Sequence, residues 1–385
     1  MTRKKVMIIA GETSGDIHGA KLISAMKQKD SSVFFGGIGG NDLKEAGVKI
    51  MVDASTLSVV GITEVFSRLP TIFRGMRRAK ELLKILDPDL LILIDFPDFN
   101  LRVAAAAKKL NIRVLYYISP QIWAWRLGRV KKIGRLVDHI AVILPFEEKF
   151  YKKHNIPVTY VGHPLLDGIS DKSEKPNNIV SDNRVIDKKK NSVIGLLPGS
   201  RDKEIARHLP VMIEAAKILN AKMNNLKFIL SVAPGVEKKI IEDIIARHSS
   251  IKNMKFSYNN VGKVFEQSCF VIAASGTVTL QAAVAGTPMV IIYKVSPVSY
   301  LLGKALIQVE NIGLVNLIAG GGIVPELVQD QASPENIAQK TYEMLKDEAG
   351  LNRLQKKLLS IRGMLGGPGA SVRVAEIAFN MMRNP

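Results

Sequence analysis

The chain contains very little cysteine. Cys269 is the one thiol among 385 residues, so an internal disulfide framework or a multi-cysteine metal site is excluded. Its apolar surroundings predict a small core side chain in a reduced, cytoplasmic protein. The six histidines are scattered and never four residues apart: His18, His139, His154, His163, His208 and His248. We therefore expect neither a metal nor a cofactor.

Long apolar runs are also missing. The longest, such as Leu90–Ile94 and Met289–Tyr293, are far shorter than the roughly 20 residues that span a bilayer. The opening segment Met1–Gly11 ends in a glycine-rich polar sequence, which is typical of a first strand and its loop rather than a signal peptide. A membrane-spanning protein is not expected.

Acidic residues are scarce relative to basic ones. Lys and Arg number 54 against 35 Asp and Glu, a formal net charge of +19. This balance predicts an anionic partner. Because no nucleic-acid motif accompanies the basic residues, phosphorylated substrates and an anionic membrane surface remain, and nucleic acid is not expected.

Short apolar segments alternate with helical patterns nearly throughout. The predicted strands are Val6–Ala10, Val33–Phe35, Leu90–Ile94, Val114–Ile118, His139–Leu144, Val158–Val161, Val193–Leu197, Phe228–Val232, Cys269–Ala274 and Met289–Tyr293. Fully apolar strands between helices predict parallel sheets covered on both faces. The polar stretch 171–191 is typical of a linker. We expect two doubly wound α/β domains, 1–170 and 192–363, with ligands at the carboxyl ends of their strands.

Three motifs follow strands of the first domain. In Gly11–Asp16, residues Glu12, Ser14 and Asp16 are candidates for acceptor binding, with Asp16 as a helix cap the alternative. The glycine cluster 36–40 is weaker evidence of the same kind.

The second motif is Asp95–Asn100. Here Asp98 is a candidate general base, and the alternative is that Asp98 or Asn100 caps a helix beginning near Leu101.

The third motif, Ser119–Arg126, holds both tryptophans, Trp123 and Trp125, beside a predicted basic helix that carries Arg126, Arg129, Lys131, Lys132 and Arg135. Aromatic rings with a basic flank suit a sugar, an acyl chain or a phosphate. Filling of an interdomain core is the alternative. His163, in Gly-His-Pro, is more typical of a structural turn.

In the second domain, Gly199, Ser200 and Arg201 suit phosphate contact. Ser275, Gly276 and Thr277 open a helix that reaches about Ala285, and free N–H groups at a helix start can hold a diphosphate. Four further polar residues flank a glycine-rich loop: Asn311, Asn316, Glu326 and Gln329. They are candidates for contacting the polar edges of a nucleotide or sugar, and roles in a surface loop are the default interpretation.

The segment Ile62–Leu86 alternates apolar and basic residues. This pattern predicts a helix that packs on a sheet or lies on an anionic bilayer. Pro70 interrupts the pattern, so we expect the first turns to be separate from the rest.

Taken in order, these motifs resemble the lipid-A-disaccharide synthases. The resemblance rests on Gly11–Asp16, Asp95–Phe99, Ser119–Trp125, Gly162–Leu165, Leu197–Arg201 and Asn316–Gly320. It implies a GT-B fold, in which two Rossmann-like domains flank a cleft and a C-terminal helix, here about 364–385, packs back on the first, acceptor-binding domain. The domain 192–363 would bind the UDP-sugar donor.

The implied reaction transfers 2,3-diacylglucosamine from its UDP donor to the 6-hydroxyl of 2,3-diacylglucosamine 1-phosphate, with inversion and without a metal. The resemblance assigns the base to Asp98, donor-diphosphate binding to Arg201, a donor-site role to Asn316 and phosphate binding to Ser275, Gly276 and Thr277. A glutamate that commonly binds the donor ribose in this fold is replaced by Gln281.

Peripheral association with the cytoplasmic face of the inner membrane, and a possible homodimer, complete these expectations. The alternatives are another UDP-sugar enzyme of this fold, namely a peptidoglycan-lipid transferase or a UDP-sugar epimerase, and a basic membrane- or nucleic-acid-associated module without catalysis.

Overall fold

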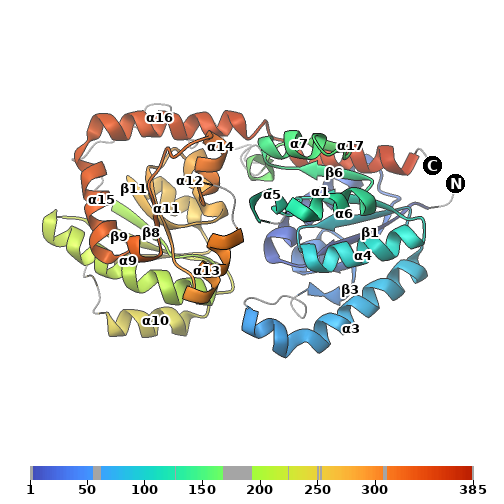
Figure 1. Ribbon diagram of the computed structural model, residues 1–385, viewed down its shortest axis with the longest axis horizontal. Helices are drawn as coiled ribbons and strands as arrows, with labels where there is room; N and C mark the ends of the chain where they lie inside the picture. The colour runs from blue at the N-terminus through green and yellow to red at the C-terminus, as the bar shows by residue number, and fades with distance from the viewer. Residues whose placement is uncertain are drawn as a thin grey trace. The chain divides into compact units, whose positions relative to one another are not determined.

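The computed structural model describes residues 3–54, 62–125, 127–167, 193–223, 225–248, 251, 254–306 and 310–383, and only the backbone at 62–70, 72, 125, 127, 298, 302, 303, 305 and 306. The chain divides into two compact units (Figure 1). Unit 1 comprises Met1–Ser173 with Leu365–Pro385, and unit 2 comprises Glu174–Met364. The expected linker 171–191 lies outside the described residues.

Unit 1 is built on a seven-stranded parallel sheet in the order β3-β2-β1-β4-β5-β6-β7. The strands are β1 (Lys5–Ala10), β2 (Phe34–Gly39), β3 (Lys49–Asp53), β4 (Leu90–Ile94), β5 (Arg113–Tyr117), β6 (His139–Val142) and β7 (Val158–Tyr160). Its helices are α1 (Thr13–Lys29), α2 (Asn41–Glu45), α3 (Ile62–Leu86), α4 (Pro97–Lys109), α5 (Ile122–Trp125), α6 (Val130–Leu136), α7 (Pro145–Lys152) and α17 (Ala370–Arg383), with short 3-10 helices η2 (Leu127–Arg129) and η3 (Pro164–Leu166).

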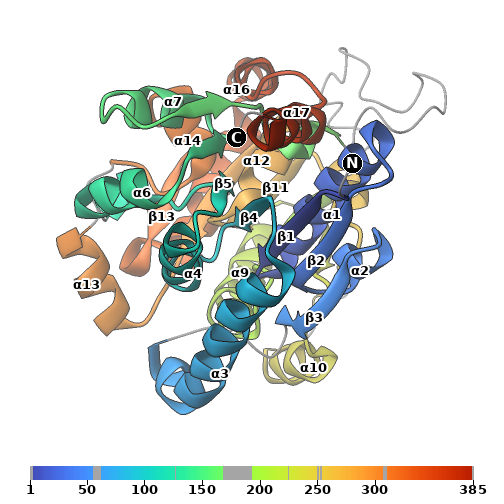
Figure 2. The same ribbon diagram turned by 90° about the vertical axis from the view of Figure 1, so that its right-hand side faces the viewer.

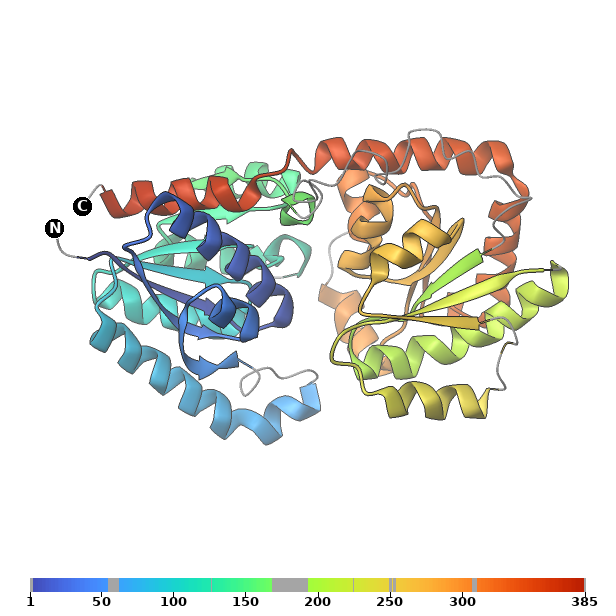
Figure 3. The ribbon, with the colours of Figure 1, turned by 180° about the vertical axis from the view of Figure 1, so that it is seen from behind.

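Helices cover both faces of this sheet. In β1, Met7 and Ile9 enter a core shared with α3, α4 and α6, whereas Val6 and Ile8 enter a core shared with α1 and α17. Figures 2 and 3 show α17 lying beside α1. Burial on both faces explains why the central strands are continuously apolar in the sequence.

The C-terminal helix α17 is fastened to unit 1 by polar contacts at its start. The Asp167 carboxylate accepts hydrogen bonds from the N–H groups of Gly369, Ala370 and Ser371 at 2.8–3.0 Å. The Arg373 guanidinium donates to the Val161 carbonyl at 2.7 Å. A segment late in the chain therefore completes a sheet face that begins with β1.

Unit 2 repeats the architecture with six parallel strands in the order β10-β9-β8-β11-β12-β13. The strands are β8 (Val193–Leu197), β9 (Lys227–Val232), β10 (Met254–Tyr258), β11 (Phe270–Ala274), β12 (Met289–Tyr293) and β13 (Glu326–Val328). The helices are α9 (Asp202–Lys222), α10 (Lys238–Arg247), α11 (Val261–Gln267), α12 (Thr277–Val284), α13 (Pro297–Leu306), α14 (Leu314–Ala319), α15 (Pro334–Lys346) and α16 (Glu348–Met364), with η4 (Gln329–Gln331).

The fold class predicted from the sequence is confirmed, and three local expectations are wrong. The glycine cluster at 36–40 is not a loop, because Gly36–Gly39 belong to β2. A Cβ atom on Gly37 would collide with the Ile8 carbonyl of the neighbouring strand, which explains the glycine. Helix α3 continues through Pro70 instead of breaking there. Helix α4 begins at Pro97, not near Leu101.

Strands β3, β10 and β13 were not predicted. All three lie at sheet edges, where one side of the strand has no neighbour and the side chains are largely half-buried or exposed. An apolar run is therefore not required there. Among the described helices, none combines the length and apolarity needed to cross a bilayer.

Candidate functional site

The predicted motifs cluster at one point of each sheet. In unit 1 the chain order reverses between β1 and β4, and in unit 2 between β8 and β11. Such a switch point separates the two neighbouring loops at the carboxyl edge and is where open α/β sheets bind ligands. Gly11–Asp16 follows β1, Asp95–Asp98 follows β4, Pro198–Arg201 follows β8 and Ser275–Thr277 follows β11. All four motifs therefore flank a switch point.

The turn after β4 is strained. Asp95 and Phe96 have φ values of 44° and 48°, which non-glycine residues rarely adopt, and Ile118 after neighbouring β5 has φ 59°. The buried Tyr116 hydroxyl and the Asn100 side-chain amide donate to the Asp95 carbonyl at 2.6 and 2.7 Å. These two hydrogen bonds hold the unusual backbone in place.

Asp98 lies in the first turn of α4, directly after this turn. Its side chain is 67% exposed, and its carboxylate forms an ion pair with Arg129 of η2 at 2.7 Å. The capping alternative is wrong for both candidates, because the N-cap residue of α4 is Phe96. The buried Asn100 instead ties the helix to the end of β4. Asp98 thus carries a solvent-accessible carboxylate on a rigidly held backbone.

The motif after β1 forms the first turn of α1. Glu12 is its N-cap residue, Ser14 is exposed, and Gly11 packs so tightly on the Phe96 ring that a Cβ atom would not fit. Asp16 does not cap α1. Its buried carboxylate accepts from the N–H groups of Gly40 and Asp42 at 2.6 and 2.9 Å and so caps α2. Asp16 therefore supports the loop, while Glu12 and Ser14 remain at its surface.

Trp123 in the motif after β5 is held by a residue that the sequence did not single out. Its indole N–H donates to the buried Glu147 carboxylate at 3.0 Å, and its ring meets Phe146 edge to face at 4.7 Å between centroids. Burial raises the pKa of Glu147 to about 7. Pro145 followed two residues later by an acid is a readable helix-start signal, but it does not reveal these partners. The Trp125 side chain and Arg126 lie outside the described residues.

In unit 2, the loop after β8 carries a glycine with a positive φ and an exposed cation. Gly199 has φ 124°, and a Cβ atom there would press on Glu204. Glu204 accepts from the Ser200 N–H at 3.0 Å and pairs with Arg201 at 3.3 Å. Arg201 is about half exposed, so its guanidinium is accessible to an anion. Glu204 is a second residue that the sequence analysis missed.

The loop after β11 begins α12. Gly276 is its N-cap residue and Thr277, the first helical residue, is exposed. Ser275 donates to the Ile312 carbonyl at 3.4 Å, and Gln281 is half-buried one turn further on. The N–H groups of this helix start are suited to a phosphate.

Asn316 and Glu326 lie together and use their polar atoms internally. The fully buried Asn316 exchanges hydrogen bonds with the Val324 backbone and donates to Glu326 at 2.7 Å. Glu326 also accepts from the N–H groups of Ile312 and Gly313. The Asn316 side chain therefore has no exposed surface and links the two ends of the glycine-rich loop through buried hydrogen bonds.

Two further histidines and a glutamine have structural contacts. His208 bridges the Pro198 carbonyl and the Lys294 N–H, both within 3.0 Å, and so ties the loop after β8 to that after β12. Gln329 exchanges hydrogen bonds with the Val295 backbone. His163 is buried and accepts from the Leu165 N–H, and burial lowers its pKa to about 4. The structural-turn interpretation of His163 is favoured.

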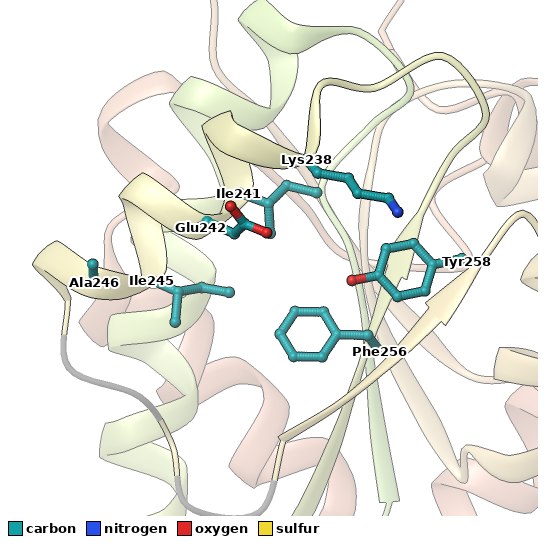
Figure 4. Close-up of a pocket in the computed structure, with 7 residues that line it drawn as sticks. All are labelled: Lys238, Ile241, Glu242, Ile245, Ala246, Phe256 and Tyr258. Atoms are coloured by element: carbon teal, nitrogen blue, oxygen red, sulfur yellow. The ribbon is translucent and has the colours of Figure 1, made fainter.

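A surface groove of about 490 Å³ lies elsewhere in unit 2, between α10 and the edge strand β10 (Figure 4). Its walls include Ile241, Ile245, Phe256 and Tyr258, with the Lys238 amino group over the Tyr258 ring. Strand β10 is separated from β8 by β9. The groove is therefore distinct from the candidate loops.

The described residues contain no group of three or more His, Cys, Asp or Glu side chains arranged to hold a metal ion. What they do offer is an exposed carboxylate in unit 1 and a set of N–H groups with a guanidinium in unit 2. The first is suited to accepting a proton and the second to holding a diphosphate.

Two doubly wound parallel sheets with ligand loops at both switch points define a GT-B protein. UDP-GlcNAc 2-epimerase from Neisseria meningitidis bound to UDP-GlcNAc has a TM-score of 0.66 at 14% identity, covering 98% of this chain and 100% of that chain. MurG of Acinetobacter baumannii has a TM-score of 0.57 at 14% identity, covering 98% and 99%. At these identities the similarity establishes the fold alone.

Sequence similarity identifies the family. The family model described as lipid-A-disaccharide synthetase matches residues 6–364. A lipid-A-disaccharide synthase of Syntrophus aciditrophicus is 43% identical over 384 residues, covering 100% of this chain and 99% of that protein. One of Geobacter metallireducens is 44% identical over 382 residues, covering 98% and 97%. The chain belongs to the lipid-A-disaccharide synthase family.

Proposed function

We propose that the chain transfers 2,3-diacylglucosamine from UDP to the 6-hydroxyl of 2,3-diacylglucosamine 1-phosphate. The products are UDP and the β(1→6)-linked disaccharide 1-phosphate precursor of lipid A. Family membership supports the reaction, and the contrast between the two switch points supports the assignment of roles. The observation that carries these roles is the accessible carboxylate of Asp98 on a rigid strained turn.

In the proposed reaction, Asp98 accepts the proton of the acceptor 6-hydroxyl. The freed oxygen attacks the anomeric carbon of the donor, and the bond from that carbon to the UDP oxygen breaks. One displacement of this kind inverts the anomeric configuration. Unit 1 accordingly binds the acceptor, with Glu12, Ser14 and Trp123 as side chains of that site.

The departing UDP carries away the bonding electron pair, so its diphosphate gains negative charge. The helix start at Ser275–Thr277, the Ser200 hydroxyl beside Gly199, and Arg201 stabilise that charge. Asn316 and Glu326 hold the adjoining loop, and the Gln281 amide hydrogen-bonds the ribose in this proposal. Unit 2 is thus the donor side.

The test is product analysis with purified protein. Both acylated substrates, with and without a chelator, should give a lipid disaccharide of the expected mass by mass spectrometry, whereas unacylated UDP-GlcNAc should give none. A C2 epimer of the UDP-sugar instead of a disaccharide would indicate an epimerase, and no conversion of any substrate would remove the enzymatic assignment.

We further propose peripheral binding to an anionic membrane through α3. Its described part places Phe73, 59% exposed, next to Arg74, with Arg77 and Arg78 one turn on. Apolar and basic side chains on one surface helix suit an anionic bilayer. Flotation with anionic liposomes at low salt should recover the protein with the vesicles, and its absence there would contradict the proposal. A homodimer stays a prediction that sedimentation at several concentrations would decide.

A further inference from the structure

Glu147 is a buried acid on the side of unit 1 proposed to bind the acceptor. It is 1% exposed and lies in the first turn of α7. One carboxylate oxygen accepts from the Ser119 hydroxyl at 3.1 Å and from the Trp123 indole at 3.0 Å. The other accepts from the Leu144 N–H at 3.1 Å. One side chain therefore joins the loop after β5 to the loop after β6.

In this cluster both carboxylate oxygens of Glu147 must accept hydrogen bonds. A hydroxyl, an indole and a backbone amide all present hydrogens to Glu147, and an ionised carboxylate accepts all three. A protonated carboxyl, or a glutamine, places its own donor against one of them. Burial opposes ionisation, raising the pKa to about 7, while the same hydrogen bonds favour it. Tyr151 of the same helix is a titratable neighbour of Glu147, and burial raises the pKa of its hydroxyl.

The location connects this cluster with the candidate site. Strands β4, β5 and β6 are consecutive neighbours, so the loops after them share the carboxyl edge that carries Asp98. Helix α5 is a single short turn of four residues and cannot fix the orientation of Trp123 by itself. The partners that do so, Glu147 and Phe146, both come from α7.

We propose that Glu147 is a positioning residue, which fixes Trp123 and the Ser119 loop in the orientation that binds the lipid acceptor. This inference rests on the proposed function and adds a residue to its acceptor side. Glu147 does not touch the reacting atoms and acts through the indole that it holds.

Glu147→Gln tests the inference, with Glu148→Gln as matched control. Glu148 is the next residue of the same helix, is partly exposed and pairs with Lys152. Loss of a hydrogen bond to a charged group predicts a KM for the acceptor about 10-fold or more higher in E147Q, with the donor KM within about 2-fold and E148Q like the wild type. Equal effects of E147Q and E148Q, or equal rises in both KM values, would overturn the inference.

A double-mutant cycle tests whether Glu147 acts through the indole. Trp123→Phe removes the donor and keeps an aromatic ring. If Glu147 works through Trp123, E147Q adds less than about 2-fold to the acceptor KM in the W123F background. Multiplicative effects of the two substitutions would contradict the mechanism.

Tryptophan fluorescence provides a readout that needs no activity. The chain has two tryptophans, so Trp125→Phe leaves Trp123 as the single emitter. In this background the emission maximum should shift when Glu147→Gln is added and stay constant when Glu148→Gln is added, because the indole N–H donates to Glu147. Emission that E147Q leaves unchanged would overturn the inference. If the wild type makes no disaccharide, the proposed function fails, and fluorescence still decides whether Glu147 holds Trp123.

Discussion

At the switch point of unit 1 the loops carry the carboxylates of Glu12, Asp95 and Asp98, whereas the loops 198–201 and 275–277 of unit 2 carry no carboxylate and include the Arg201 guanidinium. The backbones differ in the same sense. Asp95 and Phe96 hold a strained conformation that fixes where Asp98 stands. In unit 2, Gly199 instead has a positive φ of 124°, and α12 begins at Gly276 without a side-chain cap on its N–H groups. The two sheets share one topology, which sets where a ligand site can form. The residues of the loops determine which chemical groups that site suits.

The largest effect is expected for Asp98→Asn. If Asp98 is the general base, the substitution should lower kcat by at least 100-fold, while UDP affinity, measured by calorimetry, stays unchanged because unit 2 is intact. Asp42→Asn is the matched control, since Asp42 occupies the same second position of a helix after a strand. A D98N enzyme within a few-fold of wild-type activity would end the proposed role.

Unit 1 is also expected to lose stability in acid through a buried histidine. His163 in unit 1 has its pKa lowered to about 4 by burial, below the ordinary value of 6.5. Because the folded state binds the proton less readily, its stabilising contribution is complete above pH 6.5 and is lost as the pH falls towards 4. The loss is at most roughly 3 kcal/mol.

Hydrogen exchange measured peptide by peptide, corrected for intrinsic rates, should show β7 and α17 opening as the pH falls from 6.5 to 4. His163→Asn keeps a helix-capping acceptor without a titrating ring and should weaken this dependence. Burial also lowers the pKa of His18 to about 4. The pH dependence that persists in H163N should therefore come from His18. An unchanged pH profile in H163N would contradict the assignment.

Removing the cation of unit 2 should affect the donor rather than the acceptor. Arg201→Ala is expected to lower kcat/KM for the UDP-sugar about 10- to 100-fold, the range for losing a charged hydrogen-bond donor, with acceptor KM nearly constant. Arg207→Ala removes an exposed arginine nearly two helix turns away on α9 and serves as control. If acceptor KM rises instead, the assignment of the two sides must be exchanged.

The smallest effect tests the strained turn. Tyr116→Phe deletes one of the two hydrogen bonds to the Asp95 carbonyl. Stability should fall by about 1 kcal/mol, and kcat by several-fold without a change in donor KM, as Asp98 becomes less well placed. Tyr117→Phe, a change at the adjacent buried residue of β5, should leave kcat unaltered. Equal kcat losses in both variants would mean that general destabilisation is responsible.

Three strands buried on both faces were predicted to the residue, and β1, β5, β9 and β11 to within one residue at each end. Leu90–Ile94, Val193–Leu197 and Met289–Tyr293 match the structure because each must be apolar along its whole length. Edge strands such as β10, with the sequence Met-Lys-Phe-Ser-Tyr, carry no such signal. Pairing with β9, rather than composition, makes this segment a strand.

The candidate loops were also predictable, because glycine and polar residues after an apolar strand mark the carboxyl edge. It was not predictable which polar residues of these loops face solvent and which make structural contacts. Asp16 and Asn316 are polar residues in suitable motifs, yet both use their polar atoms on backbone groups brought near by folding. Glu147 shows the converse, since its partners Ser119 and Trp123 are more than 20 residues away.

The attachment of α17 has a consequence for synthesis of the protein. Val374, Ala378 and Phe379 complete a core that β1 and α1 begin, so unit 1 remains unfinished on the ribosome until all of unit 2 has emerged. Nascent chains must keep that apolar face exposed during this interval, which makes them substrates for chaperones. Loss of α17 by proteolysis or a premature stop would therefore destabilise unit 1, which contains the N-terminal strands, rather than unit 2.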